Sequence, residues 1–205
     1  MDPIDELESL FAGEGARDYL GEQVSQAAHM LQAAALARTA GSPPTLVAAA
    51  LLHDIGHFHG VLAGGRQRSG HRSAAGMRQF TDVRHSDIGA DWLAGWFPVA
   101  VCEPVRLHVA AKRYLCAAEP GYAERLSEAS VLTLSVQGGP MSAVEAAAFA
   151  AHPYAADAVA LRRFDEQAKD PGREVPGFAA YRPLLESLRD GTGPRATPAV
   201  RREST

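Results

Sequence analysis

The chain has 205 residues, of which 46% are apolar and 21% charged, and these ordinary globular proportions exclude wholesale disorder. Its 20 Lys and Arg against 24 Asp and Glu give a formal charge of -4, which argues against an extended nucleic-acid groove. An anionic substrate would therefore have to be attracted by a local basic patch rather than by the overall charge.

Three features bear on the compartment. The N-terminal segment MDPIDELESL is acidic, unlike a signal or transit peptide. The longest strongly apolar stretch, 46–52, is far shorter than the roughly 20 residues of a membrane span. Cys102 and Cys116 form neither a CxxC motif nor a disulfide framework. We therefore expect a soluble, cytoplasmic protein without a membrane partner.

Alanine-rich segments with helical periodicity dominate the chain, and no convincing alternating strand is found. The pattern predicts an all-α fold, a single helical bundle of about seven or eight helices. The predicted helices cover residues 4–11, 22–39, 44–56, 86–96, 100–116, 123–136, 142–168 (with an interruption near 152–153) and 181–189.

Two segments are not predicted to be packed helix. Residues 59–84 form a long connection rich in Gly, Arg and Ser, and its charged side chains include Arg66, Arg68, His71 and Arg72. Long connections inside compact domains are usually functional lids or mobile segments, so this one is a candidate lid. Residues 191–205 have the composition of a disordered tail, which leaves 1–190 as the predicted domain.

The strongest local signal is the sequence HDIGH, which follows the apolar run LVAAALL and contains His53, Asp54 and His57. An imidazole and a carboxylate at the end of a buried helix are costly to desolvate unless something compensates them. A metal ion does so, because it binds imidazole nitrogen and carboxylate oxygen together. The alternative is a capping Asp with hydrogen-bonded histidines, and this segment alone leaves both interpretations open.

Other histidines and one acid extend the pattern. His29 lies on the apolar face of its helix, His85 is predicted to begin a helix after the long connection, and His108 lies within another. Asp165 follows near the end of a long helix. Taken singly, His29 suits a core histidine and Asp165 a solvated charge. Taken together, their order is H…HD…H…H…D.

That order is the ligand order of the HD-domain superfamily in its two-metal form, which this chain resembles. More closely, it resembles the mixed-valence diiron oxygenases typified by 2-amino-1-hydroxyethylphosphonate dioxygenase and its relatives with N-methylated substrates. The resemblance is carried by YLGE at 19–22, His29, HDIGH at 53–57, LHVAAKRYLC at 107–116, LSEAS at 126–130, QGGPMS at 137–142 and LRRFDE at 161–166. The neighbours in the later segments are specific, since metal ligation alone does not demand them.

The resemblance implies two iron ions in the Fe(II)/Fe(III) state, with dioxygen as co-substrate. One iron would be bound by His29, His53, Asp54 and Asp165, and the other by Asp54 as a bridge, with His85 and His108. A set of nitrogen and oxygen ligands suits iron, manganese or zinc alike. Iron is therefore implied by the resemblance and not by the spacing.

The residues around the ligands distinguish an oxygenase from a hydrolase. Lys112 follows His108 by one helical turn, which puts its ammonium beside the second metal, where it can bind a phosphonate. By resemblance, His57, Ser130 and Thr133 help to hold the same group. From sequence alone, a surface lysine and helix-packing hydroxyls are the alternatives.

Tyr19 and Glu22 discriminate most sharply. In the oxygenases, a tyrosine at this place occupies the second iron until the substrate displaces it, and the glutamate forms a hydrogen bond nearby. Such gating protects an iron centre from dioxygen when no substrate is bound. Glu22 is also the nearest candidate partner for a substrate ammonium, although sequence alone would assign both residues to a helix start.

The function implied is dioxygen-dependent cleavage of the C–P bond of a 1-hydroxy-2-aminoethylphosphonate. Its amine would be primary or trimethylated, and the products would be phosphate and glycine or glycine betaine. The main alternative is a metal-dependent phosphohydrolase acting on a nucleotide or phosphate monoester through an activated water. A non-catalytic HD-type module and an oxygenase with another substrate, such as a polyol, also remain. We expect a small-molecule partner and no nucleic acid, and the oligomeric state stays open.

Overall fold

The computed structural model describes residues 2–13, 23–62 and 74–189, with side chains for 2–13, 23–58 and 84–189. These residues form helices and connecting turns and contain no β-strand, which confirms the predicted all-α fold. Several predictions lie outside the described residues. They are the roles of Tyr19 and Glu22, the loop side chains Arg66, Arg68, His71 and Arg72, and the tail 191–205.

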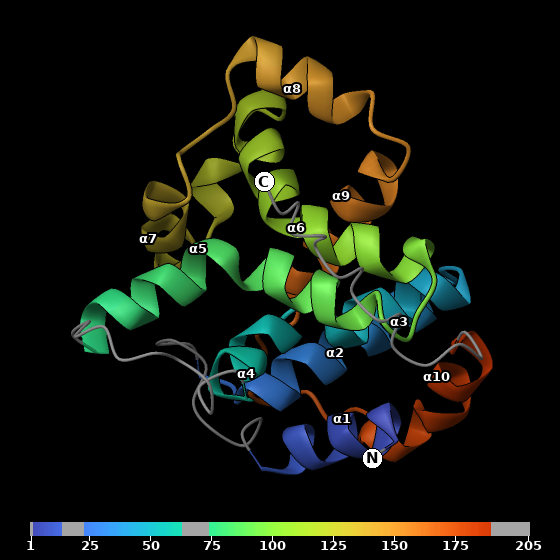
Figure 1. Cartoon of the computed structure of the whole chain (residues 1–205). Coiled ribbons are helices and arrows are strands. Elements are labelled where there is room, and N and C mark those ends of the chain that lie inside the picture. Colours follow the sequence, from blue (N-terminus) through green and yellow to red (C-terminus); the bar gives the residue numbers. More distant parts are fainter. Residues whose placement is uncertain (1, 14–22, 63–73, 190–205) are drawn as a thin grey trace, which may run out of the picture.

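The described residues contain ten α-helices (Figure 1). They are α1 (Pro3–Ala12), α2 (Gln26–Thr39), α3 (Pro44–Leu52), α4 (Ile55–Leu62), α5 (Ala74–Leu93), α6 (Val99–Ala118), α7 (Glu128–Val136), α8 (Ala143–Ala150), α9 (Ala155–Gln167) and α10 (Arg182–Leu188). Short 3-10 turns lie at Ala123–Arg125 and Phe178–Ala180. The number exceeds the expected seven or eight because the chain breaks at 53–54 and, as anticipated, near 152–153.

The predicted helix 44–56 is wrong at its C-terminal end. The helix α3 ends at Leu52, and α4 begins at Ile55. The last carbonyls of a helix have no partner within it. His53 uses one of them, since its Nδ1 lies 2.9 Å from the Ala50 carbonyl oxygen. The break turns His53 and Asp54 out of the helical repeat into the interior, where both are buried.

The predicted connection 59–84 is also wrong at both ends, because α4 continues to Leu62 and α5 already begins at Ala74. His85 therefore lies well inside α5 and does not open it. The glycine and serine content of this stretch suggested a loop, but packing between helices overrides such weak local preferences. A smaller correction concerns α2, which begins at Gln26 because the Ser25 hydroxyl accepts a hydrogen bond from the Ala28 N–H.

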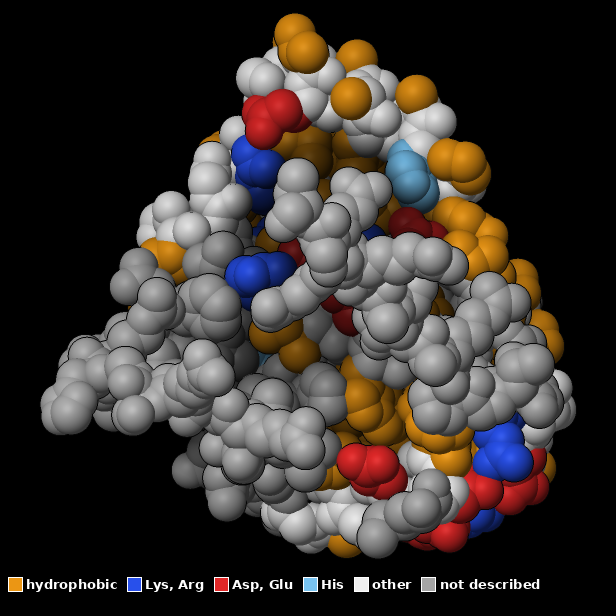
Figure 2. Space-filling view, viewed as in Figure 1, with side chains coloured by type: hydrophobic (Ala, Val, Ile, Leu, Met, Phe, Trp, Pro, Cys, Tyr) orange, Lys and Arg blue, Asp and Glu red, His pale blue; other side chains and the backbone are white. Residues whose placement is uncertain are grey.

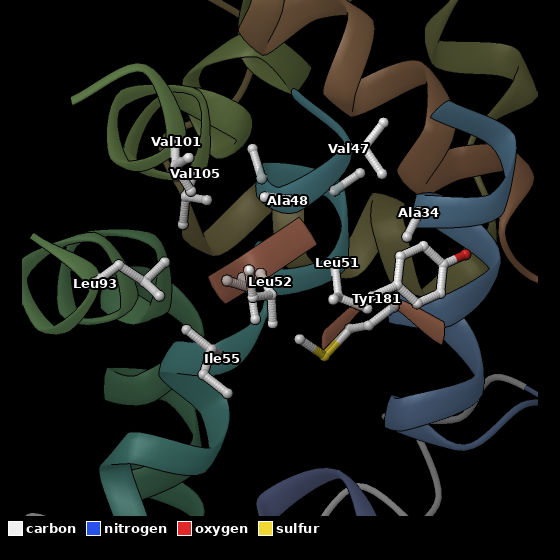
Figure 3. Packing of buried hydrophobic residues seen from close by; sticks show 14 of the residues in the cluster. Ala34, Val47, Ala48, Leu51, Leu52, Ile55, Leu93, Val101, Val105 and Tyr181 are labelled. Carbon is white, nitrogen blue, oxygen red and sulfur yellow. The ribbon is translucent and has the colours of Figure 1, made fainter. Parts of the chain in front are cut away.

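The helix α3 lies at the centre of the bundle, in contact with α2, α6, α9 and α10. Every residue from Leu46 to Leu52 is buried, because neighbouring helices surround α3 on all sides. Figure 3 shows Leu51 and Leu52 among side chains from the surrounding elements, including Leu93 of α5 and Val105 of α6. An apolar helix of this kind fixes the position of whatever follows it, which here is the His53–Asp54 pair.

The helices α4 and α5 cross at two glycines. A Cβ atom added to Gly56 would lie 1.9 Å from the backbone oxygen of His85, and one added to Gly89 would lie 3.1 Å from the Gly56 nitrogen. Only glycine allows backbones to approach so closely. This crossing brings the backbone of His85 against the segment that carries Asp54.

The two ends of the bundle differ in surface chemistry (Figure 2). Charged side chains gather over α1 and α10, where Arg182 pairs with Glu8 at 3.0 Å and Arg189 with Asp2 at 2.5 Å. Hydrophobic side chains lie over α8 at the opposite end. In the described part of the chain, no helix is long and apolar enough to cross a membrane.

Candidate metal centre and anion pocket

Five segments of the bundle bring imidazoles and carboxylates to one buried point. The side chains that meet there are His29 of α2, His53 and Asp54 after α3, His85 of α5, His108 of α6 and Asp165 of α9. Each of them is at most 5% exposed. The structure thus brings together all the residues that the sequence predicts as metal ligands, and their role as ligands stays a prediction.

Asp54 lies between two groups of histidines. Its Oδ2 is 3.7 Å from His29 Nε2 and 3.6 Å from His53 Nε2. Its Oδ1 faces the other way, 3.4 Å from His85 Nε2 and 3.6 Å from His108 Nε2. A carboxylate whose two oxygens face different nitrogen clusters is suited to bridge two cations.

The nitrogens within each group are as close as hydrogen-bonded atoms. His29 Nε2 lies 3.1 Å from His53 Nε2 and 3.3 Å from Asp165 Oδ1. On the other side, His85 Nε2 lies 2.9 Å from His108 Nε2. The inward atoms are imidazole nitrogens and carboxylate oxygens, all of which are electron-pair donors when the histidines are neutral.

Backbone carbonyls fix the direction of three of these rings. The Nδ1 atoms of His29, His53 and His108 lie 2.9, 2.9 and 2.7 Å from the carbonyl oxygens of Ala168, Ala50 and Val105, respectively. A ring that donates its Nδ1–H outward presents the Nε2 lone pair inward. Outer hydrogen bonds of this kind accompany nearly all metal-bound histidines.

A metal ion fits this arrangement. Asp54 Oδ2 is buried without a hydrogen-bond partner, although an unpaired carboxylate oxygen is costly to bury. Two donor groups have ligand atoms that all lie within 4.8 Å of one another, namely His29 with His53 and Asp165, and Asp54 with His57 and His85. A cation in each group would satisfy the facing lone pairs and the orphaned oxygen together.

The second group contains His57, which the sequence assigned to the substrate. His57 Nε2 lies 4.0 Å from Asp54 Oδ1, whereas His108 Nε2 lies 3.6 Å from the same atom. The His57 ring stacks on that of His85, with centroids 4.2 Å apart. His57 therefore sits at the edge of the cluster, close enough to contact either a metal or a group bound to it.

The electrostatics favour the protonation states that metal binding requires at both carboxylates and at His108, whereas at His29 the neighbouring Asp165 raises the pKa in spite of burial. Burial alone would raise the pKa of Asp54, but the surrounding histidines hold it well below its usual range. Burial would likewise raise the pKa of Asp165, and Arg162 and His29 lower it instead. Burial, reinforced by His53, lowers the pKa of His108 to about 4. Both carboxylates are thus ionised and His108 is neutral near pH 7.

A pocket opens beside Asp54, between α6, α7 and α9. Its lining residues are Asp54, His57, His85, His108, Val109, Lys112, Ala129, Ser130, Thr133, Gln137, Arg162, Asp165 and Lys169. Lys112 is only 3% exposed and donates a 2.8 Å hydrogen bond to the Thr133 hydroxyl. The predicted substrate residues Lys112, Ser130, Thr133 and His57 therefore line one cavity together with four of the six predicted ligands, Asp54, His85, His108 and Asp165.

Sequence reasoning missed three polar residues of this pocket. Arg162 donates to Asp165 Oδ2 at 2.5 Å, and Lys169 donates to Ser127 and Ser130 hydroxyls at 2.9 and 3.1 Å. Gln137 lines the pocket at the end of α7. Arg162 and Lys169 lie three residues before and four after Asp165, so helical spacing could have pointed to Arg162. Lys169 follows the end of α9, where such spacing carries no signal.

The segment 137–142 has a structural role that metal ligation would not explain. Gly138 and Gly139 have φ values of 99° and 69°, which favour glycine. Arg113, the neighbour of Lys112, donates to the Gly139 carbonyl at 2.8 Å and pairs with Glu145 at 2.9 Å. This anchor ties the connection between α7 and α8 to α6.

Comparison with known proteins agrees with the site. The HD domain family matches residues 27–134. Over 190 residues, the chain is 40% identical to [1-hydroxy-2-(trimethylamino)ethyl]phosphonate dioxygenase (glycine-betaine-forming) of Leisingera caerulea, covering 91% of this chain and 90% of the relative. It is also 40% identical over 187 residues to hydroxymethylphosphonate dioxygenase of Gimesia maris, covering 90% and 89%.

An all-helical bundle with a buried His and Asp cluster at its centre defines a protein of the HD-domain class. Within that class, the chain belongs to the family of the HD-domain phosphonate dioxygenases. The resemblance drawn from the sequence motifs is thereby confirmed at the level of the family.

Proposed function

We propose that this protein is a non-haem diiron dioxygenase that cleaves the C–P bond of a 1-hydroxyphosphonate. The observation that carries the proposal is a buried His and Asp cluster that shares one cavity with the cationic side chains Lys112, Arg162 and Lys169. A metal centre combined with an anion pocket suits a small substrate that bears both a hydroxyl and a phosphonate. The names of both relatives describe dioxygenases of such phosphonates.

The residues that would hold the metal are those that the sequence predicts. His29, His53, Asp54 and Asp165 would bind one iron, and Asp54, His85 and His108 the other, within a domain proposed to cover 1–190. The choice of iron is supported by the dioxygenase relatives, since the ligand types also suit manganese or zinc. When bound, iron supplies the redox chemistry with dioxygen that side chains lack.

The chain itself would bind and orient the substrate. Lys112 and Lys169 would bind phosphonate oxygens through charge-assisted hydrogen bonds, which are stronger than neutral ones. Both side chains donate hydrogen bonds to hydroxyls of α7, Lys112 to Thr133 and Lys169 to Ser130, so these hydroxyls can contact the same anion. The carbinol end of the substrate would then face Asp54 and the histidines.

Tyr19 and Glu22 retain the roles that the family resemblance implies. Tyr19 would occupy the second metal until substrate binds, and Glu22 would form a hydrogen bond near it. Holding that position closed in the resting protein would keep dioxygen from reacting without substrate.

The overall reaction balances with one dioxygen. A 1-hydroxyphosphonate and O₂ give a carboxylate and phosphate, with both atoms of O₂ accounted for in the products. We propose the trimethylamino compound named for the Leisingera relative as the first substrate, with glycine betaine as product, and the primary amine as the second. Hydroxymethylphosphonate, named for the equally similar Gimesia relative, would give formate.

The test is phosphate release by iron-loaded protein from these three phosphonates, with and without dioxygen, with a phosphate monoester as control. We expect oxygen-dependent release from at least one phosphonate and none from the monoester. Release from the monoester alone, independent of oxygen, would instead establish a phosphohydrolase. Such an enzyme would also need a cationic pocket beside its metal centre. The relative rates on the three phosphonates would identify the group that the protein accepts on the carbinol carbon.

A further inference from the structure

Arg162, which lines the pocket, is held by two side chains that do not line it, the buried Tyr122 and the half-buried Glu166. Arg162 and Tyr122 are 5% and 1% exposed, respectively. Arg162 Nε donates to the Tyr122 hydroxyl at 3.3 Å and to Glu166 Oε1 at 3.2 Å, and its Nη2 donates to the same Glu166 oxygen at 2.9 Å. The Tyr122 hydroxyl in turn donates to Glu166 Oε1, which closes a triangle of hydrogen bonds.

The Nη1 and Nη2 atoms of the same guanidinium also reach both parts of the site. Nη1 donates to Oδ2 of the predicted ligand Asp165 at 2.5 Å, and Nη2 reaches the Ser130 hydroxyl in the anion pocket at 3.4 Å. A guanidinium is planar and its N–H directions are fixed relative to one another. Whatever holds its Nε edge therefore determines where Nη1 and Nη2 point.

We propose that Tyr122 and Glu166 are positioning residues that orient Arg162, so that one guanidinium contacts both Asp165 and the anion pocket. Neither residue lines the pocket, so each acts through Arg162 and not on the substrate. The proposal rests on the proposed function only in taking this pocket to be the anion site.

The change in anion affinity on removal of the Glu166 charge distinguishes this proposal from a simple electrostatic effect. Glu166 is an anion that contacts Arg162, so removing its charge would by itself raise the positive potential of the pocket and strengthen anion binding. If its role is to orient Arg162, its removal should weaken anion binding instead. The two outcomes have opposite directions.

The experiment measures the Kd of inorganic phosphate for iron-loaded protein under nitrogen by calorimetric titration, together with iron content. We expect Tyr122→Phe to weaken phosphate binding about fivefold and Glu166→Ala about tenfold, by the worth of lost charged hydrogen bonds. Glu166→Gln, which keeps an acceptor oxygen, should restore part of the loss. In an Arg162→Lys background, Tyr122→Phe should have no further effect, because both changes act through the same guanidinium.

Tyr181→Phe is the matched control, since Tyr181 is equally buried and its hydroxyl has no hydrogen-bond partner. It should leave phosphate binding unchanged. Tighter or unchanged phosphate binding in Glu166→Ala would overturn the proposal, as would a Tyr122→Phe effect that persists in the Arg162→Lys background. The measurement needs no turnover, so failure of the proposed dioxygenase reaction would be seen separately, as absence of oxygen-dependent phosphate release.

Discussion

The metal cluster and the anion pocket share a wall but are built in different ways. The side chains of the cluster come from α2, α5, α6 and α9 and from the residues directly after α3. Backbone carbonyls fix the rings of His29, His53 and His108. The pocket depends on α7, of which only Ser130 and Leu134 are buried. Hydrogen bonds from Lys112, Arg162 and Lys169 attach α7 to the rest of the bundle, whereas the helices that carry the cluster are held mainly by packing.

This difference indicates which part of the site is rigid and which part can adapt to a substrate. Side chains locked by packing and backbone hydrogen bonds keep a metal geometry within narrow limits. Contacts between side chains, by contrast, can be exchanged for contacts to a ligand. We therefore expect changes to the cluster to abolish the metal centre and changes around α7 to alter substrate affinity while the metal centre persists.

The largest expected effect comes from Gly56→Ala, which targets the cluster through its scaffold. The added Cβ would lie 1.9 Å from the His85 backbone oxygen, so α4 and α5 must separate. We expect a loss of stability of about 3 kcal/mol or more and iron binding well below that of the wild type. Metal analysis measures the iron content, and thermal unfolding measures the stability.

The control is Gly177→Ala, where the new methyl meets nothing within 4 Å and which should match the wild type. An iron content unchanged by Gly56→Ala would show that the crossing does not position His85.

Lys112→Ala tests the other half of the comparison. The loss of a buried ammonium should raise the KM for the phosphonate about tenfold or more, the worth of one charged hydrogen bond, while iron content stays unchanged. Steady-state kinetics with metal analysis would check it. If the iron were lost together with the affinity, the two halves would not be separable; if KM did not change, the anion would bind elsewhere.

Tyr19→Phe asks whether access to the metal is controlled from outside the described residues. Iron binding should be retained, because the predicted ligands are untouched, while the substrate-free centre should oxidise in air several-fold faster. Optical absorption and electron paramagnetic resonance spectra of the iron, recorded during exposure to air, would measure this rate. Equal rates in the variant and the wild type would discredit the gating role.

The smallest effect is expected at Glu145, which supports the pocket from the surface. Hydrogen bonds from Ser142 and the pairing with Arg113 lower its pKa from 4.5 to about 2. A carboxyl whose pKa falls on folding stabilises the protein above its unfolded pKa, and that stability is lost as the pH falls toward about 2. Glu145→Gln should therefore lower Tm by roughly one or two degrees at pH 7 and not at pH 2. A difference in Tm that does not depend on pH would assign the effect to packing.

The same contrast decides what could be predicted from the sequence. The helical class and the residues of the cluster follow from periodicity and from the order of His29, the His53–Asp54 pair and Asp165, which local pattern and family resemblance capture. The break after Leu52 and the position of His85 inside α5 could not be predicted in this way. The break depends on the hydrogen bond between His53 and the Ala50 carbonyl, and the position of His85 depends on the close crossing of α4 and α5. Lys169 was missed because it reaches the pocket only through the tertiary fold.

The stoichiometry of oxygen consumption tests the central claim most directly. Dioxygen uptake and phosphate release would be followed together with iron-loaded protein and [1-hydroxy-2-(trimethylamino)ethyl]phosphonate or hydroxymethylphosphonate. Cleavage of the C–P bond by one dioxygen predicts one O₂ consumed for each phosphate released with the accepted substrate. Phosphate release without oxygen uptake would contradict the account and identify the metal centre as hydrolytic.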